Sequence, residues 1–262
     1  MRRIFEYISV SLFALTAITL IGLQFKPWGW AILGLGVLSL LFCSKDFRRN
    51  LALLYGALAL LGITPIGTST AFPNALLMGI PLVLVVLVPY LVTKHVYKNN
   101  LVRFPMRAGR QWYRREIIYI FVAAVAAYLL LPPMLRSGES YLNWMIEPGF
   151  WKMTEAYIGL NFVGIWDELF FVSTVLGILR AHFTFKFANF LQAIVFTSFL
   201  FTLGFQGWSF IVVFIFALTQ GYIFRRTDSL LYILTIHLTI DLVLHLALVY
   251  LHYPELMPIF IT

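Results

Sequence analysis

Long runs of apolar residues alternate with short stretches that carry nearly all the charge of this chain. An α-helix rises 1.5 Å per residue, so about 20 apolar residues are needed to cross the hydrocarbon core of a bilayer. The runs that approach or reach this length are Tyr7–Gln24, Trp28–Cys43, Leu51–Ile66, Ala75–Val92, Ile117–Leu135, Tyr157–Leu179, Phe187–Phe205, Trp208–Phe224 and Leu230–Leu251. The pattern predicts an all-α polytopic membrane protein with about nine transmembrane helices.

The composition strengthens this prediction. Of the 262 residues, 61% are apolar and 11% are charged, and the mean hydropathy is +0.89. A soluble domain of this size needs far more charge on its surface. Most of the chain is therefore expected to lie in lipid.

Lysine and arginine residues collect in alternate connections between the apolar runs, as they do in the cytoplasmic loops of membrane proteins. With a cytoplasmic N-terminus, only Lys26, Arg136 and Lys152 of the 19 basic residues lie outside. The inside set is Arg2, Arg3, Lys45, Arg48, Arg49, Lys94, Lys98, Arg103, Arg107, Arg110, Arg114, Arg115, Arg180, Lys186, Arg225 and Arg226. This distribution predicts an odd number of spans, an outside C-terminus and insertion into the inner or plasma membrane.

The net charge of +8 at pH 7 arises from the same loops. Its largest cluster, residues 94–115, lies between two predicted spans and includes Tyr97, Trp112 and Tyr113. Such a segment suits a surface against anionic lipid headgroups. We therefore expect membrane lipids as its partner, and no nucleic acid.

Cysteine and histidine spacing indicates neither a disulfide nor a zinc site. Cys43 is the single cysteine, so no intrachain disulfide can form. No zinc-finger spacing of His and Cys is present either. We expect no metal and no other cofactor.

Two adjacent acids, Asp167 and Glu168, interrupt the otherwise uncharged run Tyr157–Leu179. Ionised carboxylates near the middle of a bilayer are costly and usually face a polar cavity or a partner. The acids lie about 10 residues into their span, and His237 and Asp241 lie about 8 and 12 residues into theirs. Both pairs are therefore expected at a similar depth.

His237 and Asp241 share one face of a helix, and His245 continues that face. A carboxylate one turn away can set the tautomer of an imidazole, and an acid from another helix can complete a water-activating group. A purely structural interpretation is that these groups satisfy each other and brace helix contacts. Their common depth favours function. Other polar residues within the spans are interpreted as packing contacts: Gln192, Thr197, Ser198, Thr219 and Gln220.

Two segments resemble motifs of a known family. Asp167-Glu-Leu-Phe-Phe-Val-Ser-Thr-Val-Leu-Gly-Ile-Leu-Arg180 resembles the Glu-Glu-x-x-x-Arg motif of the CAAX-protease and bacteriocin-processing (CPBP, abortive-infection-like) intramembrane glutamic proteases. The stretch Arg225-Arg-Thr-Asp-Ser to His237-Leu-Thr-Ile-Asp241 resembles the family's Arg-Thr-Gly-Ser-Leu turn and closing His-x-x-x-Asn/Asp motif. The resemblance covers about residues 157–250.

The resemblance implies a metal-independent membrane-embedded endopeptidase acting on a membrane-anchored protein or peptide. Asp167 and Glu168 match the acidic pair, whose first acid is the family's base, and His237 with Asp241 match the pair that stabilises the oxyanion. It also implies a division into an N-terminal set of helices with the basic loop, residues 1–116, and a protease domain, residues 117–262.

The chain departs from the family pattern at two places. The motif arginine falls on Val172, and the histidine of the next helix's Phe-x-x-x-His motif falls on Leu200 or Phe205. A water-activating partner is therefore missing from the pattern, and groups that act as a unit lose much activity when one is removed. A catalytically inactive pseudoprotease that binds a membrane partner is the alternative. A proton- or solute-coupled carrier is a third hypothesis, which the lack of an internal repeat disfavours.

Overall fold

This computed structural model describes residues 2–69, 74–106 and 111–260. Among them, all regular structure is helical. The elements are α1 (Arg2–Thr16), η1 (Ala17–Gly22), α2 (Lys26–Ser39), η2 (Leu40–Phe42), α3 (Lys45–Ile63), α4 (Asn74–Leu91), η3 (Val92–Val96), α5 (Arg114–Ser137), η4 (Ser140–Asn143), α6 (Phe150–Asp167), η5 (Glu168–Val175), α7 (Leu176–Arg180), α8 (Phe185–Thr202), α9 (Ser209–Thr227) and α10 (Leu230–His252). Arg107 and Arg110 of the basic set lie outside the described residues.

Where one element continues directly into the next, the described chain forms nine long helical stretches, one for each predicted apolar run. Seven of them are long and apolar enough to cross a membrane. Of the other two, Lys26–Phe42 is apolar but shorter, and Lys45–Ile63 opens with four charged residues within its first five. The all-α prediction is confirmed, and the protein is a multi-pass integral membrane protein.

The predicted basic loops meet at one end of the helix bundle, which we call the basic end. There the Tyr97 hydroxyl donates to the Arg49 carbonyl at 3.3 Å, and the Leu230 amide donates to the Pro105 carbonyl at 2.8 Å. At the opposite end, the Trp144 indole donates to the Leu203 carbonyl at 3.1 Å. The charge pattern thus separates the two ends of the bundle. Which end faces the cytoplasm stays a prediction.

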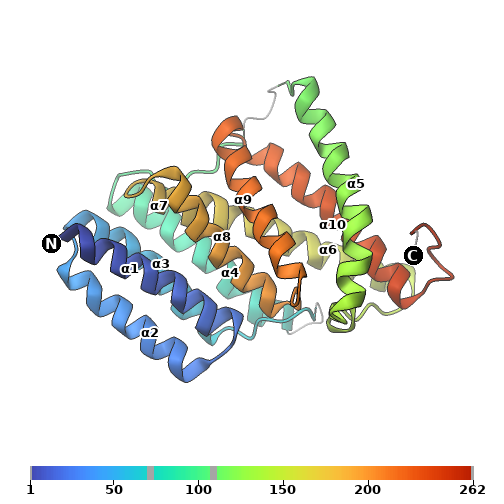
Figure 1. The fold of residues 1–262 in the computed structure, drawn as a ribbon, viewed down its shortest axis with the longest axis horizontal. Coiled ribbons are helices and arrows are strands. Elements are labelled where there is room, and N and C mark those ends of the chain that lie inside the picture. The colour runs from blue at the N-terminus through green and yellow to red at the C-terminus, as the bar shows by residue number, and fades with distance from the viewer. Residues whose placement is uncertain (1, 70–73, 107–110, 261–262) are drawn as a thin grey trace.

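The stretch α6–η5–α7 runs through the middle of the bundle (Figure 1) and is the most buried of the seven candidate spans. Aromatic side chains surround it: the Trp166 ring stacks on Phe170 at 5.1 Å and lies 4.7 Å from Phe199. The Trp166 indole donates to the Leu82 carbonyl of α4 at 2.7 Å. These contacts fix the direction in which the next two residues, the predicted acids, point.

Helix α10 lies against α6 on one side and is crossed by α5 on the other (Figure 1). The N-terminal helices α1–α4 pack against the same core, through η1 on α8 and α4 on η5. For example, the Thr202 hydroxyl donates to the Ile21 carbonyl at 2.6 Å. The division of the chain near residue 116 stays a prediction.

Candidate functional site

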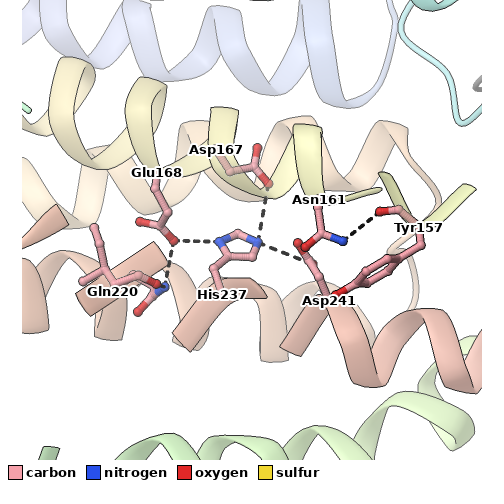
Figure 2. A network of polar contacts seen from close by, with 8 residues as sticks. Tyr157, Asn161, Asp167, Glu168, Gln220, His237 and Asp241 are labelled. Atoms are coloured by element: carbon pink, nitrogen blue, oxygen red, sulfur yellow. Dashed lines mark hydrogen bonds and ion pairs between the residues drawn. The ribbon is translucent and has the colours of Figure 1, made fainter. Parts of the chain in front are cut away.

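The structure brings the four predicted site residues together around one imidazole (Figure 2). His237 Nδ1 lies 2.7 Å from Glu168 Oε1. On the other edge of the ring, His237 Nε2 lies 3.9 Å from Asp167 Oδ2 and 3.8 Å from Asp241 Oδ1. All four residues are buried, at 5% exposure or less. Three carboxyl groups on two helices therefore surround one histidine.

A glycine lets α6 and α10 approach closely enough for these contacts. A Cβ atom added at Gly164 would lie 2.0 Å from Asp241 Oδ2 and 3.2 Å from His237 Cδ2. Gly164 is one turn before Asp167 on α6, so it occupies the position directly opposite the His237–Asp241 face of α10. A larger residue there would have to displace the Asp241 carboxylate and would crowd the His237 ring.

The acids lie where the helix changes its winding. Asp167 is the last residue of α6, and Glu168 begins the π-helical segment η5. A π-helix has wider turns than an α-helix and often occurs at functional sites. Here the change allows two consecutive acids to address opposite nitrogens of the same ring, as the distances above show. The sequence pattern gave no indication of this segment.

Gln220 on α9 is a member of the site, although sequence analysis interpreted it as a packing residue. Its Nε2 donates to Glu168 Oε1 at 2.7 Å and to the Ile233 carbonyl at 3.3 Å. Glu168 Oε1 is thereby an acceptor from two sides, so the tautomer that fits carries a proton on His237 Nδ1. Only the spatial arrangement could identify this role, because glutamine also serves helix packing in membranes.

A cavity of about 260 Å³ opens beside the site, between α5, α6, α8, α9 and α10. Asp167, His237 and Asp241 line it, whereas Glu168 does not. Most other lining side chains are apolar, among them Leu130, Leu160, Val212, Phe216 and Ile240. Asp167 Oδ1 and Asp241 Oδ2 have no hydrogen-bond partner in the described part of the chain. The cavity thus combines an apolar wall with carboxylate oxygens that can hold water.

Of the other polar candidates, Thr219 on α9 also lines this cavity, and the rest lie elsewhere. Gln192 is fully buried and lies near Gly221, away from the cavity lining. Thr197 and Ser198 border a separate apolar cavity together with residues of η1 and α9. The His245 ring packs 5.2 Å from the Tyr157 ring. Across the described residues, no group of three or more His, Cys, Asp or Glu side chains has an arrangement that could hold a metal ion.

One protein-family model matches the part of the chain that contains this site. Residues 149–243 match the model "Type II CAAX prenyl endopeptidase Rce1-like". This segment includes α6, η5, α7, α8 and α9 and the four residues around the imidazole. It confirms the resemblance given by the two sequence motifs. No curated protein and no solved structure matches the chain.

The departures from the Rce1-like pattern have clear places in the structure. Val172, at the position of the motif arginine, is fully buried in η5. Leu200 and Phe205, the two alternatives for the missing histidine, both line the cavity that Asp167 and His237 share. The position of the missing histidine is therefore next to the site and is filled by an apolar side chain.

Proposed function

We propose that the protein is an intramembrane endopeptidase that hydrolyses a peptide bond of a membrane-anchored protein or peptide inside the cavity. The observation that carries this proposal is the shared lining of one apolar cavity by Asp167, His237 and Asp241. An apolar wall suits a membrane-embedded chain, and the carboxylates of Asp167 and Asp241 supply groups that can bind water there. The Rce1-like match of this segment supports the same activity.

In this proposal, Asp167 is the general base. Of the two adjacent acids, only Asp167 lines the cavity, and its Oδ1 is free to accept a bond from water. Asp167 removes a proton from the water, and the hydroxide attacks the carbonyl carbon. When the C–N bond breaks, that proton passes to the leaving nitrogen, so the base returns to its ionised form.

Glu168 acts through the imidazole. It holds His237 Nδ1 at 2.7 Å and is itself held by Gln220 at 2.7 Å. An imidazole ring keeps one orientation and one tautomer when a carboxylate holds one of its two nitrogens. His237 Nε2 then faces Asp167, Asp241 and the cavity, where it relays the proton and, once protonated, stabilises the oxyanion.

The test is proteolysis by the full chain in liposomes, with a library of membrane-anchored peptides as substrates. Asp167→Asn keeps the side-chain volume and removes the base, so we expect a loss of about 10²- to 10⁴-fold. Glu168→Gln and Gln220→Met are expected to lower kcat less, with little change in KM, because they disturb only the orientation of His237.

Glu155→Gln is the matched control, since it makes the same acid-to-amide change on α6 at a half-exposed position paired with Lys152. It should leave proteolysis unchanged. Equal cleavage by wild type and Asp167→Asn would contradict the assignment of the base. A folded wild type that cleaves nothing would contradict the proposed activity.

The second candidate is a pseudoprotease that binds its membrane partner without cutting it. The observation in its favour is that Leu200 and Phe205 line the cavity where the family pattern has a histidine. This function predicts that the intact partner co-purifies with wild type and is lost in Gly164→Leu, which fills the cavity wall. A shortened product released by wild type would refute it.

A further inference from the structure

A second cavity, of about 360 Å³, lies at the basic end between the 99–105 connection, η5, α7 and the end of α9. Its lining differs from that of the cavity beside His237, which we call the catalytic cavity, because most of its side chains are polar or charged. The polar and charged ones are Asn99, Asn100, Arg103, Ser173, Arg180 and Asp228. Its volume is in the range of small-ligand sites.

Positive charge predominates in and around this cavity. Among the described lining residues, Arg103 and Arg180 face one carboxylate, that of Asp228. Arg225 is close enough to Arg180 to repel it, as is Arg103, whereas Asp228 attracts it. The guanidinium groups of Arg180 and Arg225 lie 5.8 Å and 4.4 Å from the centre of the same Phe185 ring. An anion between the arginines would relieve their mutual repulsion.

A buried hydroxyl also points to a ligand. Ser173 is 2% exposed and lines the cavity. Within the described residues its Oγ has no hydrogen-bond partner. It lies on η5, whose π-helical winding also carries Glu168. A polar atom buried without a partner is unfavourable unless a water or ligand satisfies it.

The remaining polar groups fit an acceptor-rich ligand. Asn99 is held in place, because its Nδ2 donates to Asn50 Oδ1 at 3.2 Å and its Oδ1 accepts from the Leu101 amide at 3.4 Å. Asn100 is at φ 49° and also lines the cavity. Two guanidinium groups, amide N–H groups and a hydroxyl together offer many donors to a tetrahedral oxyanion.

We propose that this cavity binds a phosphate group, supplied by an anionic phospholipid headgroup or by a soluble phosphate. The candidate spans Phe150–Arg180 and Ser209–Thr227 end beside it, so a headgroup at the membrane surface can reach Arg103 and Arg180. The site is separate from the catalytic cavity, with which it shares no lining residue. It does not depend on the proposed protease activity.

The test uses the full chain in a neutral detergent and measures binding by native mass spectrometry, together with the shift in the unfolding temperature. The probes are phosphatidylglycerol, phosphatidylcholine and inorganic phosphate. We expect phosphatidylglycerol to bind and to raise the unfolding temperature, because a ligand of the folded state stabilises it. Arg180→Gln and Arg103→Gln should each weaken its binding about tenfold.

Arg48→Gln is the matched control, since Arg48 is an exposed arginine at the same end that does not line the cavity. Ser173→Ala should weaken binding without lowering the stability of the unliganded protein, because it removes a hydroxyl without a partner. Binding of phosphatidylglycerol alone would identify a lipid, and binding of inorganic phosphate alone a soluble ligand. An equal loss in Arg48→Gln, or no binding of either phosphate compound, would overturn the proposal.

Discussion

At the scale of single residues, the site depends on a glycine, Gly164, that lies opposite polar side chains. Gly164 gives the space in which Asp241 and His237 approach α6. The acids alone do not define the site, because their positions relative to the imidazole follow from the helix contact that Gly164 permits. The same residue lines the cavity, so its size affects both the contact and the space for substrate.

We predict that Gly164→Ala lowers proteolysis about tenfold or more, because its Cβ would lie 2.0 Å from Asp241 Oδ2 and must displace it. Gly56→Ala is the control: a Cβ there has nothing within 4 Å, and alanine favours a helix by about 0.5–1 kcal/mol over glycine. Liposome proteolysis measures the activity of both variants, and thermal unfolding shows whether each is folded. Full activity in Gly164→Ala would show that the α6–α10 distance is not critical.

The missing histidine can also be tested at this scale. Leu200 lies on α8 and lines the cavity with Asp167 and His237. If water activation limits the rate of a working protease, Leu200→His should raise kcat several-fold by adding a second base. The matched variant Leu200→Gln adds a polar group that cannot act as a base. Equal rates in both variants would contradict a catalytic effect of the added imidazole.

At the scale of elements, the sequence predicted the nine helices and the depth of the two polar pairs, because hydrocarbon thickness fixes how long an apolar run must be. It did not predict the π-helical winding of η5 or the contact from Gln220 to Glu168. Both depend on how neighbouring helices pack, which no local pattern records. The predicted end of the seventh run at Phe205 also differs, since α8 ends at Thr202 and Gly204 follows at φ 108°.

The contact between α3 and the α7–α8 connection should make the folding stability depend on pH. Burial lowers the pKa of His182 below its ordinary value of 6.5, and the ring lies 3.1 Å from Asn50 Nδ2 and packs edge-on against Phe47. The unfolded chain then binds this proton more readily than the folded protein does. The stability that the neutral ring contributes is present above about pH 6.5 and decreases as the pH falls below it.

We therefore expect the unfolding temperature of the wild type to fall between about pH 7.5 and about pH 5.5. His182→Gln keeps a neutral polar side chain beside Asn50 and should reduce that fall. His95→Gln, at an exposed position in η3, should leave it unchanged. Identical pH dependence in the wild type and His182→Gln would contradict this role of the junction.

At the scale of the whole molecule, the two ends of the bundle differ in charge. Lys45, Arg103 and Arg225 lie at the basic end. At the opposite end, Trp144 donates to the Leu203 carbonyl and Trp208 to Ser137 at the end of α5. Positively charged loops remain in the cytoplasm of most membrane proteins. The phosphate site and the positive surface would then both face the cytoplasmic leaflet, which carries the anionic lipids.

This orientation can be measured with single-cysteine variants in a Cys43→Ala background. Cys43 itself is a poor target, because burial raises the pKa of its thiol to about 11 and thiolates are the reactive form. Met145→Cys, at a residue 76% exposed, should react with a membrane-impermeant maleimide in intact cells. Lys45→Cys, exposed at the basic end, should react only after the cells are permeabilised. The reverse labelling pattern would place the basic end outside and would make cytoplasmic phospholipid headgroups inaccessible to Arg103 and Arg180.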